Sequence, residues 1–431
     1  MAVIEGLPYG TQRVQFAPPP GWRLQRVEPR APARRAPAAE ILEAALASPI
    51  GSRPLRELAR GRRTAAILIP GKARRVGTQA YVPRLVDELN AGGIADDAIE
   101  IFLADGTHEQ HLERDIAELI GGDIIRRVRC IGHACDDGDS VVRVGTTRAG
   151  TPVFLNRRVC AADLKIVTGR IVPHYFAGFT GGRKTLIPGV AGFETIVANH
   201  RLTLDGTGGI HPAARAGNLD DNPVHLDMLE AARMAPPDFC VNTLLDTEHR
   251  IMAAVAGDFE AAHAEGVRLA QALLHVTLDA PVDAAIVSAG GLPYDCNFMQ
   301  ALKAPFNTQS IVRRGGALLW LAECRGGIQP QFLEWASIAA DDELRRAVSA
   351  RYALTGHNSI MLRELIRRVD VALYSALPSA TVRGLGLHPV ASIADGVRWL
   401  AERHPAPMTC AIVPHASSMH ASLTDHPCGA Q

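Results

Sequence analysis

Residues 64–103, TAAILIPGKARRVGTQAYVPRLVDELNAGGIADDAIEIFL, place an amphipathic stretch between two short apolar runs. The runs at 64–70 and 98–103 have the length of buried strands, and residues 81–89 carry apolar side chains at helical spacing. A strand, a helix and a second strand in this order form the repeating unit of a parallel sheet. The stretch therefore predicts an α/β fold.

The same alternation continues along the chain and restarts near residue 278. Further strands are predicted at 164–168, 284–288, 317–321, 371–374 and 409–413, and further helices at 112–120, 226–234, 259–274, 300–313, 342–351, 360–369 and 393–402. A chain of 431 residues is also too long for one ordinary core. We expect two α/β domains with largely parallel sheets, residues 1–277 and 278–431, the second with a short C-terminal tail. The active site is expected in the cleft between them, beyond the carboxyl ends of the strands.

Composition argues against several classes of protein. Lys and Arg total 45, as do Asp and Glu, so no net charge attracts nucleic acid or an anionic membrane. No apolar run reaches the roughly 20 residues of a membrane helix. The N-terminal sequence MAVIEGLPYGTQRVQF lacks the features of a signal peptide, and residues 17–40, rich in Pro, Ala and Arg, resemble an extended arm or surface loop. The eight cysteines form no C-x-x-C pair, which fits a cytoplasmic protein with reduced thiols.

Residues 178–185, GFTGGRKT, come close to the phosphate-binding loop G-x-x-x-x-G-K-[ST]. Arg183 stands where the second glycine belongs, and Pro188 follows too soon for the helix that such a loop requires. We therefore reject a nucleotide-hydrolysing loop. What remains is a glycine-rich turn that presents Lys184, one of only four lysines in a chain whose other 41 basic residues are arginine. A lysine kept in such a chain is a candidate for amine chemistry, which arginine cannot perform.

Three histidines lie in or beside glycine-rich segments. His108 follows a predicted strand in ADGTHEQH, and His174 and His200 stand near the start and at the end of residues 173–200. Histidine can transfer protons near neutral pH or bind a metal through a neutral nitrogen. The chain has neither an H-E-x-x-H motif nor cysteine and histidine at zinc spacing. A bound metal would therefore take most of its ligands from a cofactor.

These segments resemble the nickel-dependent lactate racemases and their 2-hydroxy-acid racemase and epimerase relatives. The resemblance is carried by Gly106-Thr107-His108 and by three longer motifs of the family pattern. The most specific of these is residues 173–200, PHYFAGFTGGRKTLIPGVAGFETIVANH, and it is followed by GNLDDNPVHLDMLEAA (217–232) and GGLPYDCNFMQALKA (290–304). The similarity extends from about residue 5 to about residue 415.

The resemblance implies a racemase or epimerase of a 2-hydroxy acid that uses a nickel pincer nucleotide made by dedicated cofactor-building enzymes. In such a reaction the α-hydride moves to the pyridinium ring of the cofactor while a histidine takes the hydroxyl proton. A planar 2-keto acid forms, and the hydride returns to its other face. By position in the motifs, the resemblance implies that Lys184 attaches the cofactor covalently, that His200 binds nickel, and that His108 and His174 are the acid/base pair. It implies cofactor contacts for Gly181, Gly182, Pro188 and Gly189. It implies substrate binding by Arg74, Gln300 and Lys303.

Two departures from the family pattern leave alternatives open. Residues 71–75 read GKARR where the family has D-x-T-R-P, and Glu109 stands where the family usually has arginine. One alternative is a divergent relative that acts on another hydroxy acid. The other is a non-catalytic protein that binds the nickel cofactor. A pure carrier has no need of an acid/base pair, so His108 and His174 argue against the second alternative.

Overall fold

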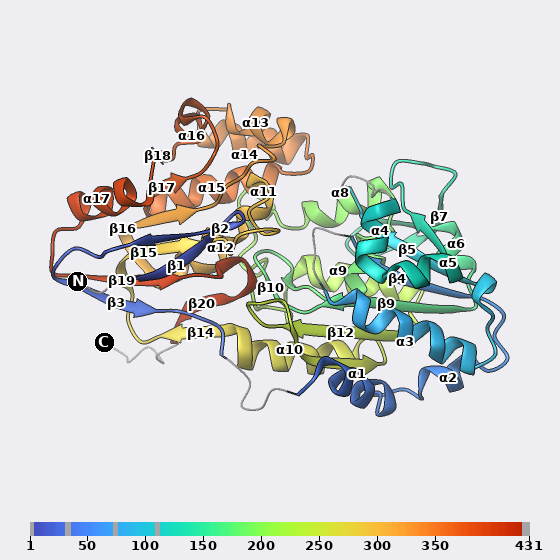
Figure 1. Ribbon diagram of the computed structural model, residues 1–431. Coiled ribbons are helices and arrows are strands. Elements are labelled where there is room, and N and C mark those ends of the chain that lie inside the picture. Colours follow the sequence, from blue (N-terminus) through green and yellow to red (C-terminus); the bar gives the residue numbers. More distant parts are fainter. Residues whose placement is uncertain (1–3, 31–35, 72–75, 108–112, 425–431) are drawn as a thin grey trace, which may run out of the picture.

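The computed structural model describes residues 4–30, 36–71, 76–107 and 113–424. Two six-stranded sheets organise the chain (Figure 1). The first sheet has the strand order β13-β12-β9-β4-β5-β6, in which β13 pairs antiparallel with β12 and the other neighbours are parallel. Its strands are β4 (Ala65–Pro70), β5 (Ile99–Ala104), β6 (Arg129–Gly132), β9 (Leu164–Arg170), β12 (Phe239–Leu245) and β13 (Ile251–Gly257).

The second sheet has the order β18-β17-β16-β15-β19-β3, and its neighbouring strands are all parallel. Its strands are β3 (Trp22–Arg26), β15 (Val282–Ser288), β16 (Val312–Leu321), β17 (Asp370–Tyr374), β18 (His388–Val390) and β19 (Met408–Val413). Two largely parallel sheets confirm the predicted α/β fold.

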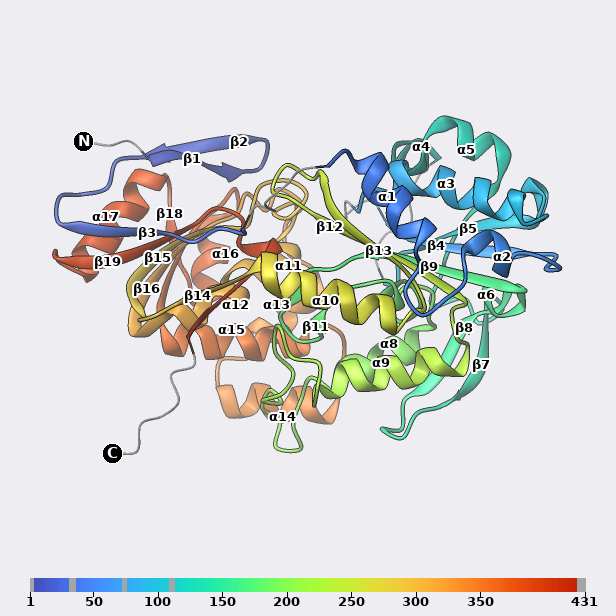
Figure 2. The same cartoon turned by 90° about the horizontal axis from the view of Figure 1, so that it is seen from below.

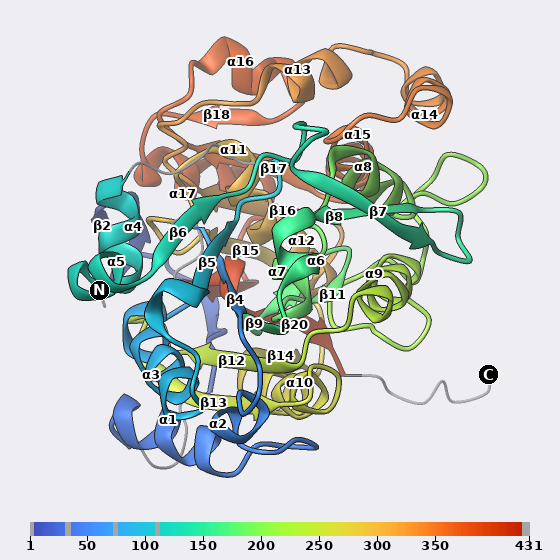
Figure 3. The same cartoon turned by 90° about the vertical axis from the view of Figure 1, so that its right-hand side faces the viewer.

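Both faces of the first sheet are covered, which explains why its strands read as continuous apolar runs. All six residues of β4 are buried, and they alternate between two cores. Ile67 and Ile69 pack with α3 (Thr78–Ala91) on one face, and Leu68 lies in the core with α9 (Pro223–Met234) on the other. Figure 3 shows α1 (Ala38–Ala47) and α3 on one side of this sheet and α9 on the opposite side.

The N-terminal segment lies with the second sheet rather than in a free arm. Within the predicted arm of residues 17–40, β3 pairs with β19 through Trp22 and Met408, and α1 begins at Ala38. The arm prediction was wrong for these residues, because an edge strand that is almost entirely exposed carries little apolar signal. The hairpin of β1 (Ile4–Tyr9) and β2 (Gln12–Phe16) also packs on this half (Figure 2). The division into two domains at residue 277 stays a prediction. The structure adds that the N-terminal strands β1, β2 and β3 lie with the second sheet.

Most other predicted elements agree with the structure within a few residues. The exception is the predicted helix 300–313, which divides into α11 (Phe298–Ala301), α12 (Lys303–Thr308) and a 3-10 turn before β16 begins at Val312. The remaining helices are α2 (Leu55–Leu58), α4 (Glu113–Ile120), α5 (Gly122–Arg127), α6 (Arg157–Ala161), α7 (Arg183–Leu186), α8 (Phe193–Arg201), α10 (Ala261–Leu274), α13 (Pro330–Ala336), α14 (Asp341–Ala350), α15 (Gly356–Arg368), α16 (Ser379–Gly384) and α17 (Ile393–Arg403). The short strand pairs are β7 (Val141–Thr146) with β8 (Pro152–Asn156), β10 (Pro173–His174) with β11 (Gly178–Phe179), and β14 (His275–Leu278) with β20 (His420–Leu423).

Two further sequence expectations concern membrane-spanning helices and the state of the cysteines. Within the described parts of the chain, no helix combines the length and apolar character needed to cross a membrane. The cysteines in those parts are all free: Cys130, Cys135, Cys160, Cys240, Cys296, Cys324 and Cys410. Free thiols agree with the expectation that the cysteines are reduced.

Candidate active site

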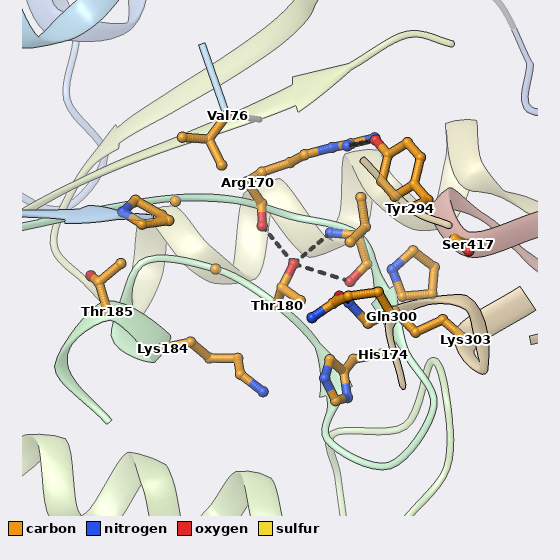
Figure 4. Close-up of a pocket in the computed structure, with 15 residues that line it drawn as sticks. Val76, Arg170, His174, Thr180, Lys184, Thr185, Tyr294, Gln300, Lys303 and Ser417 are labelled. Carbon is orange, nitrogen blue, oxygen red and sulfur yellow. Dashed lines mark hydrogen bonds between the residues drawn. The ribbon is translucent and has the colours of Figure 1, made fainter. Parts of the chain in front are cut away.

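A cleft between the two halves brings predicted site residues from both into one place (Figure 4). Its empty space is about 760 Å³, counted with its open mouth. The first half contributes the carboxyl ends of β4 and β9 and the loop that follows β9, with His174, Gly181 and Lys184. The second half contributes Gln300 and Lys303, together with Tyr294 and Ser417.

Lys184 is presented by a single helical turn. The chain leaves β9, forms the β10–β11 hairpin with His174 opposite Gly178, and then turns into α7, which ends at Leu186. No helix was predicted here because of Pro188, and the helix that does form is a single turn that ends before this proline. Lys184 is 6% exposed, and its Nζ lies 5.6 Å from the centroid of the Phe176 ring. The amine is therefore held inside the cleft rather than in open solvent.

The ring of Phe176 is the centre around which the predicted residues gather. The His174 ring meets it edge-on with centroids 4.5 Å apart, and the His200 ring lies 5.3 Å away. His357, on α15 of the second half, meets it at 4.9 Å. Lys184, His174 and His200 thus lie around one aromatic ring, as their shared motif suggests. Sequence reasoning missed both Phe176 and His357.

His200 is positioned by the end of α8 and by the segment around Asn222. Asn199 anchors this helix, because its Nδ2 donates to Val224 O at 3.1 Å and to Asp227 Oδ2 at 2.8 Å. Asn222 caps α9 by accepting two backbone N–H groups, and its own Nδ2 donates to the Phe176 carbonyl at 2.9 Å. The motif residues 217–232 therefore hold His200 and Phe176 in position through hydrogen bonds to Asn199 and to the Phe176 carbonyl. The sequence alone did not suggest this role.

Gln300 and Lys303 form a hydrogen-bonded pair on the second half. Lys303 Nζ donates to Gln300 Oε1 at 2.7 Å, and the Asn297 side chain accepts from the Gln300 backbone N–H at 2.9 Å. Both residues also line a second hollow of about 1280 Å³, which reaches His174, His200 and His357. An ammonium group held in this way can bind a carboxylate that enters between the halves.

Two predicted site residues, His108 and Arg74, lie outside the described residues, as do Glu109 and residues 72–75. The residues just before His108 nevertheless lie beside the loop that carries Lys184, His174 and His200. The Gly106 N–H donates to the Gly189 carbonyl at 3.0 Å, and Thr107 lines the second hollow. The G-T-H motif and the 173–200 motif are thus neighbours in space, although they are far apart in sequence.

The glycines of the loop are required by packing within the protein. A Cβ at Gly181 would lie 2.4 Å from the His263 ring, and at Gly182 it would lie 2.8 Å from Cys240 Sγ. A Cβ at Gly189 would lie 2.4 Å from the Thr185 carbonyl. Among the four predicted cofactor contacts, Gly181 lines the cleft, whereas Gly182, Pro188 and Gly189 are not among its lining residues. Their contact with a cofactor stays a prediction.

Gly181→Ala is expected to destabilise the protein far more than Gly93→Ala does. Both glycines have positive φ, 141° and 101°, but no described residue lies within 4 Å of a Cβ at Gly93. Backbone strain alone costs about 1–2 kcal/mol, and overpacking against His263 adds about 1–3 kcal/mol at position 181. Urea unfolding of the cofactor-free proteins measures the difference. Equal losses at the two positions would contradict the packing argument.

Positive charge and neutral imidazoles surround α7. Arg183 is 1% exposed, and its NH1 group lies 2.6 Å from His263 Nε2. Burial, together with the charges of Arg183 and Lys184, lowers the pKa of His225 to about 3. Burial, followed by the charge of Arg183, also holds the pKa of His263 well below its usual value. Both imidazoles are therefore neutral at physiological pH.

The cleft itself is a cationic environment. Its lining includes Arg170, Lys184 and Lys303, and its described lining residues include no aspartate or glutamate. Such a lining suits anionic ligands, among them a hydroxy acid and a nucleotide-derived cofactor. Arg170 was also missed by sequence reasoning. It is the last residue of β9, and a polar residue at the carboxyl end of a parallel strand is a signal that could have found it.

Comparison with known proteins gives consistent matches. Residues 9–209 match the family model described as the lactate racemase N-terminal domain. The chain is 37% identical to a lactate racemase of Lactiplantibacillus plantarum over 290 residues, 67% of this chain and 66% of that protein. It is 31% identical to a lactate racemase of Thermoanaerobacterium thermosaccharolyticum over 347 residues, 80% of each chain.

Solved structures agree with these matches. The structure is similar to that of the lactate racemase apoprotein from Thermoanaerobacterium thermosaccharolyticum, with a TM-score of 0.88 and 27% identity. That match covers 97% of this chain and 100% of the other. A protein from Thermotoga maritima, at 18% identity and a TM-score of 0.69 over 90% of this chain and 98% of that one, shares the fold.

Proposed function

The chain belongs to the lactate racemase family, and on this premise we propose that it is a racemase or epimerase of a 2-hydroxy acid that carries a nickel pincer nucleotide on Lys184. One observation carries the proposal. Lys184, His174 and His200 surround the Phe176 ring at the cleft between the halves. An amine, a proton-transfer group and a metal ligand are thereby close enough to act on one bound molecule.

The residues present fit such a cofactor. Lys184 supplies the amine for covalent attachment, and the His200 imidazole supplies a nitrogen ligand for nickel. The cationic lining, with no carboxylate among its described residues, suits the anionic groups of a nucleotide. When bound, the cofactor supplies a hydride acceptor, which the side chains of this protein do not offer.

The chain's own residues would bind the substrate and move its proton. Lys303 and Gln300 would hold the substrate carboxylate from the second half; their hydrogen bond and their position in the cleft lining support this role. His174 is proposed to exchange the proton of the substrate hydroxyl, and its ring is oriented by the Ala177 backbone N–H, which donates to His174 Nδ1 at 3.3 Å. His108 is proposed as the partner base on the other face, since the two enantiomers present their hydroxyls differently. Thr107, next to it in sequence, lines the same hollow as His174.

The alternatives differ in what they require of the cleft. A protein that only carries the cofactor needs Lys184 and His200, but it has no use for substrate-binding groups. The hydrogen-bonded Gln300–Lys303 pair beside His174 therefore supports an enzyme. A relative that acts on a hydroxy acid other than lactate remains the second reading, because residues 71–75 and Glu109 depart from the family pattern.

The protein produced together with the cofactor-building enzymes is expected to contain one nickel per chain and a covalent adduct at Lys184. Intact mass, peptide mapping and nickel analysis measure both, and loaded protein is then assayed for racemisation of lactate and other 2-hydroxy acids. Unmodified Lys184 without nickel, in an experiment where a known family member does load, would contradict the proposal. These partner enzymes and a cytoplasmic location are part of the proposal.

A further inference from the structure

Arg170 is a buried cation that the proposed reaction does not use. Its side chain is 8% exposed at the carboxyl end of β9, and it lines the cleft together with Lys184 and Lys303. In the described parts of the chain no carboxylate forms an ion pair with it, and its Nε atom has no hydrogen-bond partner there. Buried charges in proteins are normally paired, because removing a charge from water without compensation is costly.

The partner that Arg170 does have cannot offset this charge. Its NH1 group donates a hydrogen bond to Tyr294 OH, and its guanidinium carbon lies 5.8 Å from the centroid of the same ring. The Tyr294 phenol comes from the second half, so the contact crosses the cleft. A neutral phenol orients a guanidinium but brings no negative charge. An anionic ligand bound in the cleft would supply the negative charge that Tyr294 does not.

The position of Arg170 separates it from the substrate-binding pair. In Figure 4 the guanidinium reaches across to Tyr294 on one side of the cleft, while Gln300 and Lys303 lie apart from it and Lys184 points elsewhere. The pair Gln300–Lys303 already provides one carboxylate site, and it is internally hydrogen-bonded. The Arg170 guanidinium, which lies away from that pair, fits a second anionic group of a bound ligand.

We propose that Arg170 and Tyr294 form a second oxyanion subsite of the cleft, distinct from the one at Gln300 and Lys303. The guanidinium fork takes two oxygens of a carboxylate or phosphate through Nε and one terminal nitrogen, and Tyr294 fixes its direction. The subsite rests on the proposed function, because its oxyanion would belong to the cofactor or to the substrate of that reaction. The source of this oxyanion is either the phosphate of the bound nucleotide or the second carboxylate of a 2-hydroxy diacid.

The subsite is tested first on cofactor-free, full-length protein by calorimetry at low salt. The probes are inorganic phosphate, the diacid malate and the monoacid lactate. The variants are Arg170→Gln and Arg170→Lys, and the matched control is Arg268→Gln, an arginine of α10 that is 65% exposed and paired with Glu265. Arg170→Gln is expected to weaken binding of phosphate or malate about 10- to 100-fold. Arg170→Lys recovers part of the loss, and Arg268→Gln changes nothing.

The loaded enzyme then distinguishes the two sources. If the oxyanion is the cofactor phosphate, Arg170→Gln retains less nickel per chain than the wild type. If it is a second carboxylate, nickel is retained and only the KM for malate rises, with no change for lactate. Wild-type protein that binds neither phosphate nor malate, or an Arg170→Gln variant that binds both like the wild type, would overturn the subsite. Loss of the Lys184 adduct in wild type would instead contradict the proposed function and leave the calorimetric result standing.

Discussion

Lys184→Arg is expected to yield a folded protein without covalent cofactor, without stoichiometric nickel and with racemase activity reduced at least about 10³-fold. Arginine keeps the positive charge and can still lie over the Phe176 ring, where Lys184 Nζ is 5.6 Å from the centroid. It lacks the nucleophilic amine that attachment requires. The substitution therefore separates chemistry from charge, which an alanine variant does not.

The matched control for this variant is Lys165→Arg. Lys165 lies in β9 and pairs with Asp238 at 3.6 Å, so arginine preserves what it does. The control is expected to load nickel and to turn over like the wild type. Intact mass, nickel per chain and racemisation rate are measured on the three proteins side by side. A Lys184→Arg protein that retains one cofactor per chain would show that attachment occurs elsewhere.

His174→Phe is expected to lower kcat in both directions about 10²- to 10⁴-fold while nickel per chain stays at the wild-type level. Phenylalanine can keep the ring contacts of His174, which stacks on Tyr175 at 5.0 Å and meets Phe176 edge-on at 4.5 Å. It has no nitrogen with which to move a proton. The packing of the cleft is thus retained while acid/base catalysis is lost.

His388→Phe serves as the control for this second variant. His388 is exposed on β18 and stacks on Trp399 at 5.5 Å, on the second sheet and outside the cleft lining. Its racemisation rate is expected to match the wild type. Undiminished kcat in His174→Phe would remove this residue from the mechanism. Loss of nickel together with activity would reassign it to cofactor binding.

The sequence predicted those features that depend on residues close together in the chain. Buried strands such as β4 and β9 are continuous apolar runs, because both faces of their sheet are covered. The motif at 173–200 predicted that Lys184, His174 and His200 belong together, and they do surround Phe176.

Features that arise from contacts between distant segments were not predictable in this way. The role of Phe176 depends on rings from α8 and α15, and the burial of Arg170 depends on Tyr294 of the other half. The edge strand β3 carries alternating polar residues whose partner, β19, lies near the other end of the sequence. Neither periodicity nor local spacing contains that information.

The pairing of β3 with β19 sets an order of events during synthesis. The first half can fold as it emerges from the ribosome, since residues 38–274 contain its sheet and the helices that cover it. The second sheet cannot be completed until Met408 is available to pair with Trp22. Until then β3 has no neighbouring strand, whereas the β1–β2 hairpin, through Leu7 and Phe16, packs with residues of β15 and β16, which are made earlier. A strand near the C-terminal end of the sequence, β19, therefore completes the second sheet by pairing with a strand of the N-terminal segment.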